Sequence, residues 1–111
     1  MSDSYPAPIE QNGQDIVINV HEDGALALVP VTLRDAGKVI DASALTVNFK
    51  VKAINFTKAL GANPGDARGR GLSLTKAECA SIPDGARWAI WDDTDAANPV
   101  DQGKGVFRKY R

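Results

Sequence analysis

The feature that most constrains the fold of this chain is a strict alternation of apolar and polar side chains in its middle. Along residues 45–53, apolar side chains occupy every second position: Leu45, Val47, Phe49, Val51 and Ala53. The positions between them are polar: Thr46, Asn48, Lys50 and Lys52. Successive side chains of a β-strand point to opposite faces of the sheet, so this period of two predicts a strand with one buried and one solvated face.

Shorter runs of the same kind accompany this strand, and turn residues separate them. We expect strands at residues 15–20, 25–33, 39–40, 45–54, 72–74, 86–91 and 105–110. The Asp23-Gly24 pair is typical of a tight hairpin between the first two strands. Pro30 cannot donate a hydrogen bond to a neighbouring strand, so its strand should lie at a sheet edge or carry a bulge. About seven short strands predict an all-β fold, an immunoglobulin-like two-sheet β-sandwich.

One short helical turn is expected to interrupt the strands. Thr75 and Glu78 have the spacing of a capping box, in which each side chain bonds a free backbone amide at the start of a helix. Pro83 should end this helix after about Ser81. Cys79 falls within the turn, where a lone cysteine usually behaves as a small buried hydrophobic residue.

Two segments carry no strand pattern. Residues 1–13 include Pro6 and Pro8 and predict an extended N-terminal arm, either frayed or ordered against a neighbouring subunit. Residues 55–71 contain four glycines and one proline and predict a long exposed loop of the kind that binds or covers something. The chain length then fits one sandwich domain over residues 14–111, preceded by the arm.

The charge balance and the single cysteine limit the classes of partner and compartment. The chain has 13 basic and 14 acidic residues, so no net field favours nucleic acid or an anionic membrane, and we expect neither as a partner. Cys79 stands alone, which excludes an intramolecular disulfide and a thiolate metal cluster and suits a reducing cytoplasm. The sequence shows neither a signal-peptide pattern nor an apolar run of membrane-spanning length.

No group of residues has the spacing of a catalytic or metal site. Asp93 and Asp95, which follow Asp92, begin like a calcium loop, but Ala97 stands where a third ligand belongs and no glutamate closes the loop. His21 is the only histidine, and its predicted turn offers no oriented partner in a cleft. We therefore predict no catalytic residue, no metal site, no cofactor and no enzymatic activity.

Several residues are instead candidates for contact with a partner. Arg68 and Arg70 lie in the predicted loop, where they either face solvent or bind a carboxylate on a neighbouring protein. Trp88 and Trp91 are three apart on a predicted strand, hence on opposite faces, so one should be core and the other exposed or covered by a partner. The full set of interface candidates is Tyr5, Pro6, Pro8, Arg68, Arg70, Trp88, Trp91 and Tyr110.

Residues 29–52, VPVTLRDAGKVIDASALTVNFKVK, combine several turn and strand motifs in a fixed order. A Pro-Val strand at Pro30-Val31 precedes a turn with Asp35 and Gly37, an Asp-x-Ser corner at 41–43 and a Val-x-Phe-x-Val strand at 47–51. This arrangement resembles tailed-bacteriophage virion proteins, in particular the β-sandwich at the N-terminus of siphophage baseplate upper proteins and related tail-fibre and adaptor domains. Residues 74–85, with the aromatic strand and closing hairpin that follow, are similar to the second half of such domains.

The resemblance implies a structural virion protein of the tail, baseplate, neck or fibre, made in the host cytoplasm. It would act by assembly with copies of itself, as a homo-oligomer, and with other virion proteins, through surfaces rather than catalytic residues. Two alternatives stay open: a capsid decoration protein, and a carbohydrate-binding or adhesion module. The carbohydrate alternative predicts an exposed tryptophan in a shallow groove with polar neighbours, whereas assembly predicts a protein partner over that tryptophan.

Overall fold

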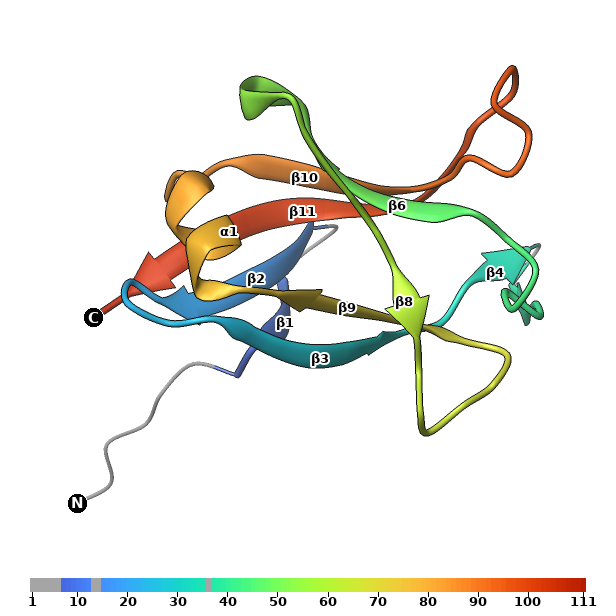
Figure 1. Ribbon diagram of the computed structural model, residues 1–111, viewed down its shortest axis with the longest axis horizontal. Coiled ribbons are helices and arrows are strands. Elements are labelled where there is room, and N and C mark those ends of the chain that lie inside the picture. Colours follow the sequence, from blue (N-terminus) through green and yellow to red (C-terminus); the bar gives the residue numbers. More distant parts are fainter. Residues whose placement is uncertain (1–6, 13–14, 36) are drawn as a thin grey trace.

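The structure, a computed structural model, describes residues 7–12, 15–35 and 37–111 and is an all-β sandwich, as predicted (Figure 1). Within these residues, six strands form one sheet, three form a second, and two form a small ribbon. The elements in chain order are β1 (Ile9–Asn12), β2 (Asp15–His21), β3 (Leu26–Val31), β4 (Arg34–Asp35), β5 (Lys38–Val39), β6 (Val47–Val51), the 3-10 helix η1 (Lys52–Ile54), β7 (Phe56–Ala59), β8 (Gly61–Ala62), β9 (Arg70–Leu74), α1 (Lys76–Ser81), β10 (Arg87–Asp92) and β11 (Val100–Tyr110).

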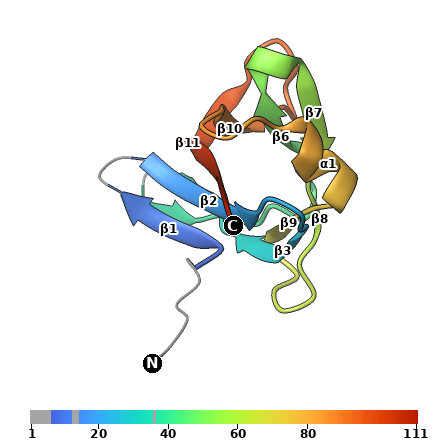
Figure 2. The same cartoon turned by 90° about the vertical axis from the view of Figure 1, so that its left-hand side faces the viewer.

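The larger sheet has the strand order β1-β2-β11-β10-β6-β7. All of its pairs are antiparallel except β2 and β11, which run parallel with Ile18 opposite Phe107. The end-on view shows this sheet bending, so that β1 and β2 come round toward the layer that holds β3 and β9 (Figure 2). The first part of the chain and its last strand therefore close the sandwich together.

The smaller sheet, β3-β9-β8, confirms the prediction made from Pro30. Strand β3 lies at the sheet edge, and its register with β9 shifts between Leu26 and Val29. The missing amide hydrogen of Pro30 is thus accommodated in a strand that is both an edge and irregular. The ribbon β4–β5 pairs only Arg34 with Val39 and Asp35 with Lys38.

The middle of the alternating stretch supplies the centre of the core, as predicted, whereas Leu45 is half-buried and Ala53, which lies beyond the strand, is exposed. Val47, Phe49 and Val51 on β6 are buried, and the Phe49 ring lies 5.6 Å from the Trp88 ring on the adjacent β10. Phe107 on β11 has no exposed surface. Burying side chains of this size stabilises the fold by about 1.5–3 kcal/mol each, so these few positions hold the two layers together.

Helix α1 also matches its prediction. The Thr75 hydroxyl accepts a hydrogen bond from the Glu78 amide, and the Glu78 carboxylate accepts one from the Thr75 amide. Glu78 forms an ion pair with Lys58 of β7 as well. The ion pair therefore connects the helix to β7, the edge strand of the larger sheet, beside which the helix lies in Figure 2.

The predicted long loop at residues 55–71 was wrong. This segment contains β7 and β8 and the first residues of β9. The predicted strand at 45–54 was too long, because β6 ends at Val51. The 3-10 helix η1 then reverses the chain, so that Phe56 pairs with Val51. Asn55 makes this reversal possible by adopting a left-handed backbone (φ 54°), which asparagine tolerates better than most residues.

Three other features of the fold differ from the prediction. The turn at residues 21–24 does not form a hairpin, because β2 and β3 belong to different sheets. Strand β11 begins at Val100 rather than at 105, since its pairing with β10 continues past a register shift at Trp91. The predicted arm at 1–13 includes a regular strand, β1, and its residues 1–6 and 13 lie outside the described part of the chain.

Candidate functional site

The interface candidates predicted near the termini have contrasting surroundings. Tyr5 and Pro6 lie outside the described residues. Pro8 is exposed, and its carbonyl accepts a hydrogen bond from the Asn19 amide. Tyr110 is half-buried at the end of β11, where its ring meets His21 edge-on at 5.5 Å.

The two arginines of the predicted loop differ in burial and in surroundings. Arg68 is exposed, whereas Arg70 is half-buried at the start of β9. The Arg70 guanidinium donates to the carbonyl oxygens of Ser43 and Leu45, at 2.8 and 2.9 Å. These bonds fasten the segment before β6 to the smaller sheet, so Arg70 has a structural role within the chain.

The two tryptophans lie on opposite faces of β10, as their spacing predicts. Trp88 is 4% exposed and packs in the core with Ile90, whereas Trp91 is half-buried on the outer face. Trp91 is thus the tryptophan available to a partner.

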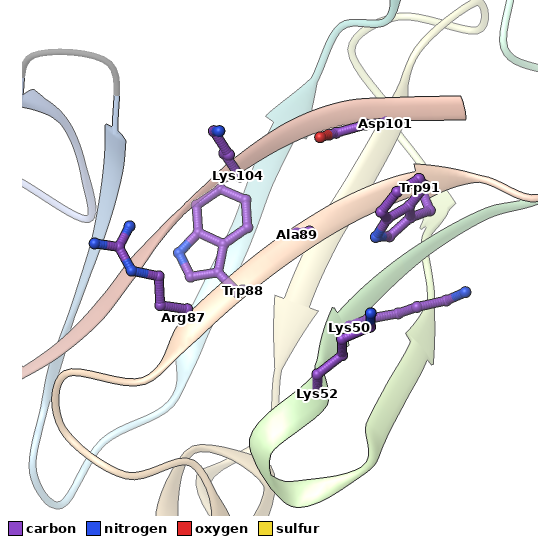
Figure 3. Close-up of a pocket in the computed structure, with 8 residues that line it drawn as sticks. All are labelled: Lys50, Lys52, Arg87, Trp88, Ala89, Trp91, Asp101 and Lys104. Atoms are coloured by element: carbon purple, nitrogen blue, oxygen red, sulfur yellow. The ribbon is translucent and has the colours of Figure 1, made fainter. Parts of the chain in front are cut away.

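Trp91 borders a shallow hollow on the outer face of β6, β10 and β11 (Figure 3). The hollow has a volume of about 270 Å³. Its lining comes from three neighbouring strands and the start of η1: Lys50, Lys52, Arg87, Trp88, Ala89, Trp91, Asp101 and Lys104.

Cross-strand register explains why a hollow forms there. Ala89 pairs with Lys50 of β6 on one side and with Lys104 of β11 on the other. Trp91, two residues further along the same face, pairs with Asp101. The small side chain of Ala89 therefore leaves a depression, with Trp91 on one side of it and Lys104 and Arg87 on the other (Figure 3).

The hollow is predominantly cationic. It carries four basic side chains, Lys50, Lys52, Arg87 and Lys104, and one carboxylate, Asp101, for a net charge of +3. The whole chain has a net charge of −1, so the remaining residues together carry −4. Asp93 and Asp15, which pair with two of these cations beside the hollow, reduce this local excess of positive charge to +1.

Two of the four cations already have partners. Lys50 pairs with Asp93 at 2.9 Å, and Arg87 pairs with Asp15 at 3.2 Å. A hydrogen bond from Asn48 and the contact with Lys50 lower the pKa of Asp93 below its ordinary value of 3.8. Among the described residues, neither Lys52 nor Lys104 has a carboxylate partner.

The groups considered for catalysis or metal binding are engaged in local structure. The Asp92 carboxylate accepts bonds from the amide and hydroxyl of Thr94, and the Asp95 carboxylate accepts bonds from Ala97 and Asn98. Nδ1 of His21 accepts a bond from the Asp23 amide. Across the described part of the chain, no three metal-ligating side chains gather into one group.

Cys79 is buried in the core, as predicted, and this burial raises the pKa of its thiol.

The sequence names Trp88 and Trp91 as candidates without deciding between them, and it does not indicate the lysines, Arg87 and Asp101 around Trp91. Lys50 and Lys52 were visible as the polar face of the alternating strand, which was a partial signal. The other neighbours depend on which strands pair and in what register, and this information is not local in sequence.

The chain matches no protein-family model, and comparisons with curated proteins and with solved structures give no match. Over the residues that the structure describes, no helix has both the length and the apolar character needed to cross a membrane.

Proposed function

We propose that this protein is a structural subunit of a bacteriophage virion that acts by assembling with copies of itself and with other virion proteins. The motif order of residues 29–52 supports this proposal through its resemblance to siphophage baseplate and tail-fibre domains. The β-sandwich fold is compatible with it, because such a domain offers a rigid scaffold for surface contacts. Its place would be the tail, baseplate, neck or fibre, with capsid decoration as the alternative.

The observation that carries the assembly proposal is a pair of exposed valines on two segments that a hydrogen bond joins; Leu28 on β3 is the third large apolar side chain exposed among the described residues. Val39, on the ribbon β4–β5, is 39% exposed, and Val100, at the start of β11, is 52% exposed. The Arg34 amide, directly across from Val39, donates to the Gln102 side chain, which places the ribbon beside β11. A two-residue ribbon is marginally stable alone, so contact with a neighbouring subunit would stabilise it.

Contact through these valines is favoured over pairing at the sheet edges. Strand β3 carries Pro30 and an irregular register, β8 has two residues, and β1 is short and follows Pro8. The edge formed by β7 lies beside α1, to which Lys58 is paired. Proline, short length and cover are the usual means by which proteins prevent strand addition.

The test is the mass and symmetry of the purified protein, measured by light scattering and negative-stain electron microscopy. We expect the wild-type chain to form closed rings or tubes. The double variant Val39→Asp/Val100→Asp should be monomeric, with unchanged β-type circular dichroism, because it places charge in the contact. Ala77→Asp, on the exposed side of α1, is the matched control and should assemble normally. A wild-type chain that stays monomeric at high concentration would contradict the proposal.

A second candidate function, carbohydrate binding, is favoured by a different observation. The half-buried Trp91 borders a shallow hollow with lysine, arginine and aspartate side chains around it. The shallow hollow with polar neighbours supports this alternative, although Trp91 is half-buried where the alternative predicts an exposed tryptophan. The hollow and the exposed valines involve different residues, so one virion subunit could use both.

A further inference from the structure

We infer that the hollow beside Trp91 binds an acidic saccharide, a sugar that carries carboxylate, sulfate or phosphate groups. This inference rests on the second candidate function, and it adds the chemical class of the ligand. The hollow and the assembly contact share no residue, because neither Val39 nor Val100 lines the hollow, although Asp101 directly follows Val100 along β11.

The hollow is open to solvent and has a volume of about 270 Å³. The floor is the methyl group of Ala89, and the Trp91 indole stands at one end (Figure 3). A sugar ring has an apolar face of C–H groups that can pack on such a surface while its hydroxyl groups stay at the polar rim.

The charges around the hollow select an anionic sugar. Lys50 and Lys104 belong to the strands on either side of Ala89, so their backbones are about 10 Å apart, twice the usual strand spacing. Lys104 and Lys52 have no carboxylate partner among the described residues and are free to pair with a ligand. An acidic group on a ring seated over Ala89 would lie between Lys104 on one side and Lys50 and Lys52 on the other.

The residues around the hollow disfavour two other partners that could occupy a basic surface, a nucleic acid and a protein. A nucleic acid strand would bring a row of phosphates against Asp101, Asp93 and Asp15, and it would find a single half-buried aromatic on which to stack. A protein partner would bury lysines at the centre of the contact, where lysine is depleted in known interfaces. Sugar hydroxyls can donate to Asp101 while an acidic group on the same ring accepts from lysine.

The experiment is a titration with tri-galacturonate at pH 7, with maltotriose as the neutral control, followed by tryptophan fluorescence and calorimetry. We expect tri-galacturonate to bind and to change the Trp91 emission, and its affinity should fall as salt is raised. Maltotriose should bind at least tenfold more weakly, because it offers the lysines no negative charge.

Matched variants locate the site. Trp91→Ala should abolish binding, and Ala89→Leu should do the same by filling the hollow while leaving the outer lysines in place. Lys104→Ala should weaken binding about three- to tenfold, whereas Lys76→Ala, which removes another exposed lysine, on α1, should have no effect. Heteronuclear NMR spectra of each variant establish that it is folded.

Three outcomes would overturn the inference: maltotriose binding as tightly as tri-galacturonate, tighter binding of oligo-dT, or no binding of either saccharide. Light scattering on the same samples reports assembly separately. A wild-type protein that assembles but does not bind tri-galacturonate would reject this inference alone. A wild-type protein that binds tri-galacturonate but stays monomeric would reject the assembly proposal alone.

Discussion

Gly105 is the position where the fold tolerates a side chain least. A β-carbon there would lie 1.7 Å from the carbonyl oxygen of Ile16 and 2.8 Å from the Trp88 ring. The first contact is with the backbone of β2, which pairs directly with this part of β11, so it cannot be relieved by rotating a side chain. The absence of a side chain at Gly105 therefore allows the Trp88 ring to lie against the sheet.

We expect Gly105→Ala to lower the free energy of unfolding by about 3 kcal/mol or more, at the upper end of the cost of overpacking. Gly103→Ala is the matched control on the same strand, because a β-carbon there meets nothing within 4 Å. Its effect should be within about 0.5 kcal/mol. Urea denaturation followed by circular dichroism measures both, and equal effects of the two substitutions would contradict the proposed role of Gly105.

Among the elements, α1 depends on Glu78 for two contacts at once. Its carboxylate accepts from Lys58 of β7 and from the Thr75 amide, and these bonds lower its pKa below the ordinary value of 4.5. A carboxylate with a lowered pKa in the folded protein stabilises the fold above its ordinary pKa. This stabilisation is lost as the pH falls through the pKa of the folded state.

Glu78→Gln should therefore destabilise the protein by about 1 kcal/mol at pH 7, the usual size of a cap and a partly exposed ion pair. The difference from wild type should shrink as the pH falls below 4.5. Thermal denaturation at pH 7, 5 and 3 measures this trend. Glu22→Gln, whose partner Arg111 is 90% exposed, is the control, with an effect below about 0.5 kcal/mol at each pH. A difference for Glu78→Gln that stays constant with pH would refute the assignment.

The elements also show what local sequence can and cannot predict. The alternation in β6, the cap of α1 and the edge position of Pro30 were predictable because each is set by neighbouring residues. The strands in residues 55–71 were not, since glycine and proline there outweighed short runs such as Phe56–Ala59. Trp91 was named from its spacing, but Lys104 and Asp101 join it only through cross-strand pairing.

At the scale of the whole molecule, the pairing of β2 with β11 was the least predictable feature. It joins Ile18 to Phe107 across most of the chain, and nothing local to either strand indicates the other as its partner. The Asp23-Gly24 pair predicts a hairpin because it is a local signal that joins neighbouring strands. In the structure, the chain crosses there between sheets, and its last strand fills the place beside β2.

This closure predicts that a chain shortened to residues 1–106 will not fold. It lacks Phe107, which is completely buried, and most of the segment of β11 that pairs with β2. The loss of one buried phenylalanine costs about 3–5 kcal/mol. Together with the unpaired edge of β2, this approaches the total stability of about 5–15 kcal/mol that is usual for a domain.

We expect the shortened chain to give a coil-like circular dichroism spectrum and collapsed amide dispersion in NMR, whereas removal of Arg111 alone should leave both unchanged. The Arg111 side chain is 90% exposed and pairs with the surface carboxylate of Glu22. A native-like spectrum from residues 1–106 would mean that β10, β6 and the smaller sheet form a stable unit without closure by β11. Folding of these strands would then not depend on the pairing of β11 with β2.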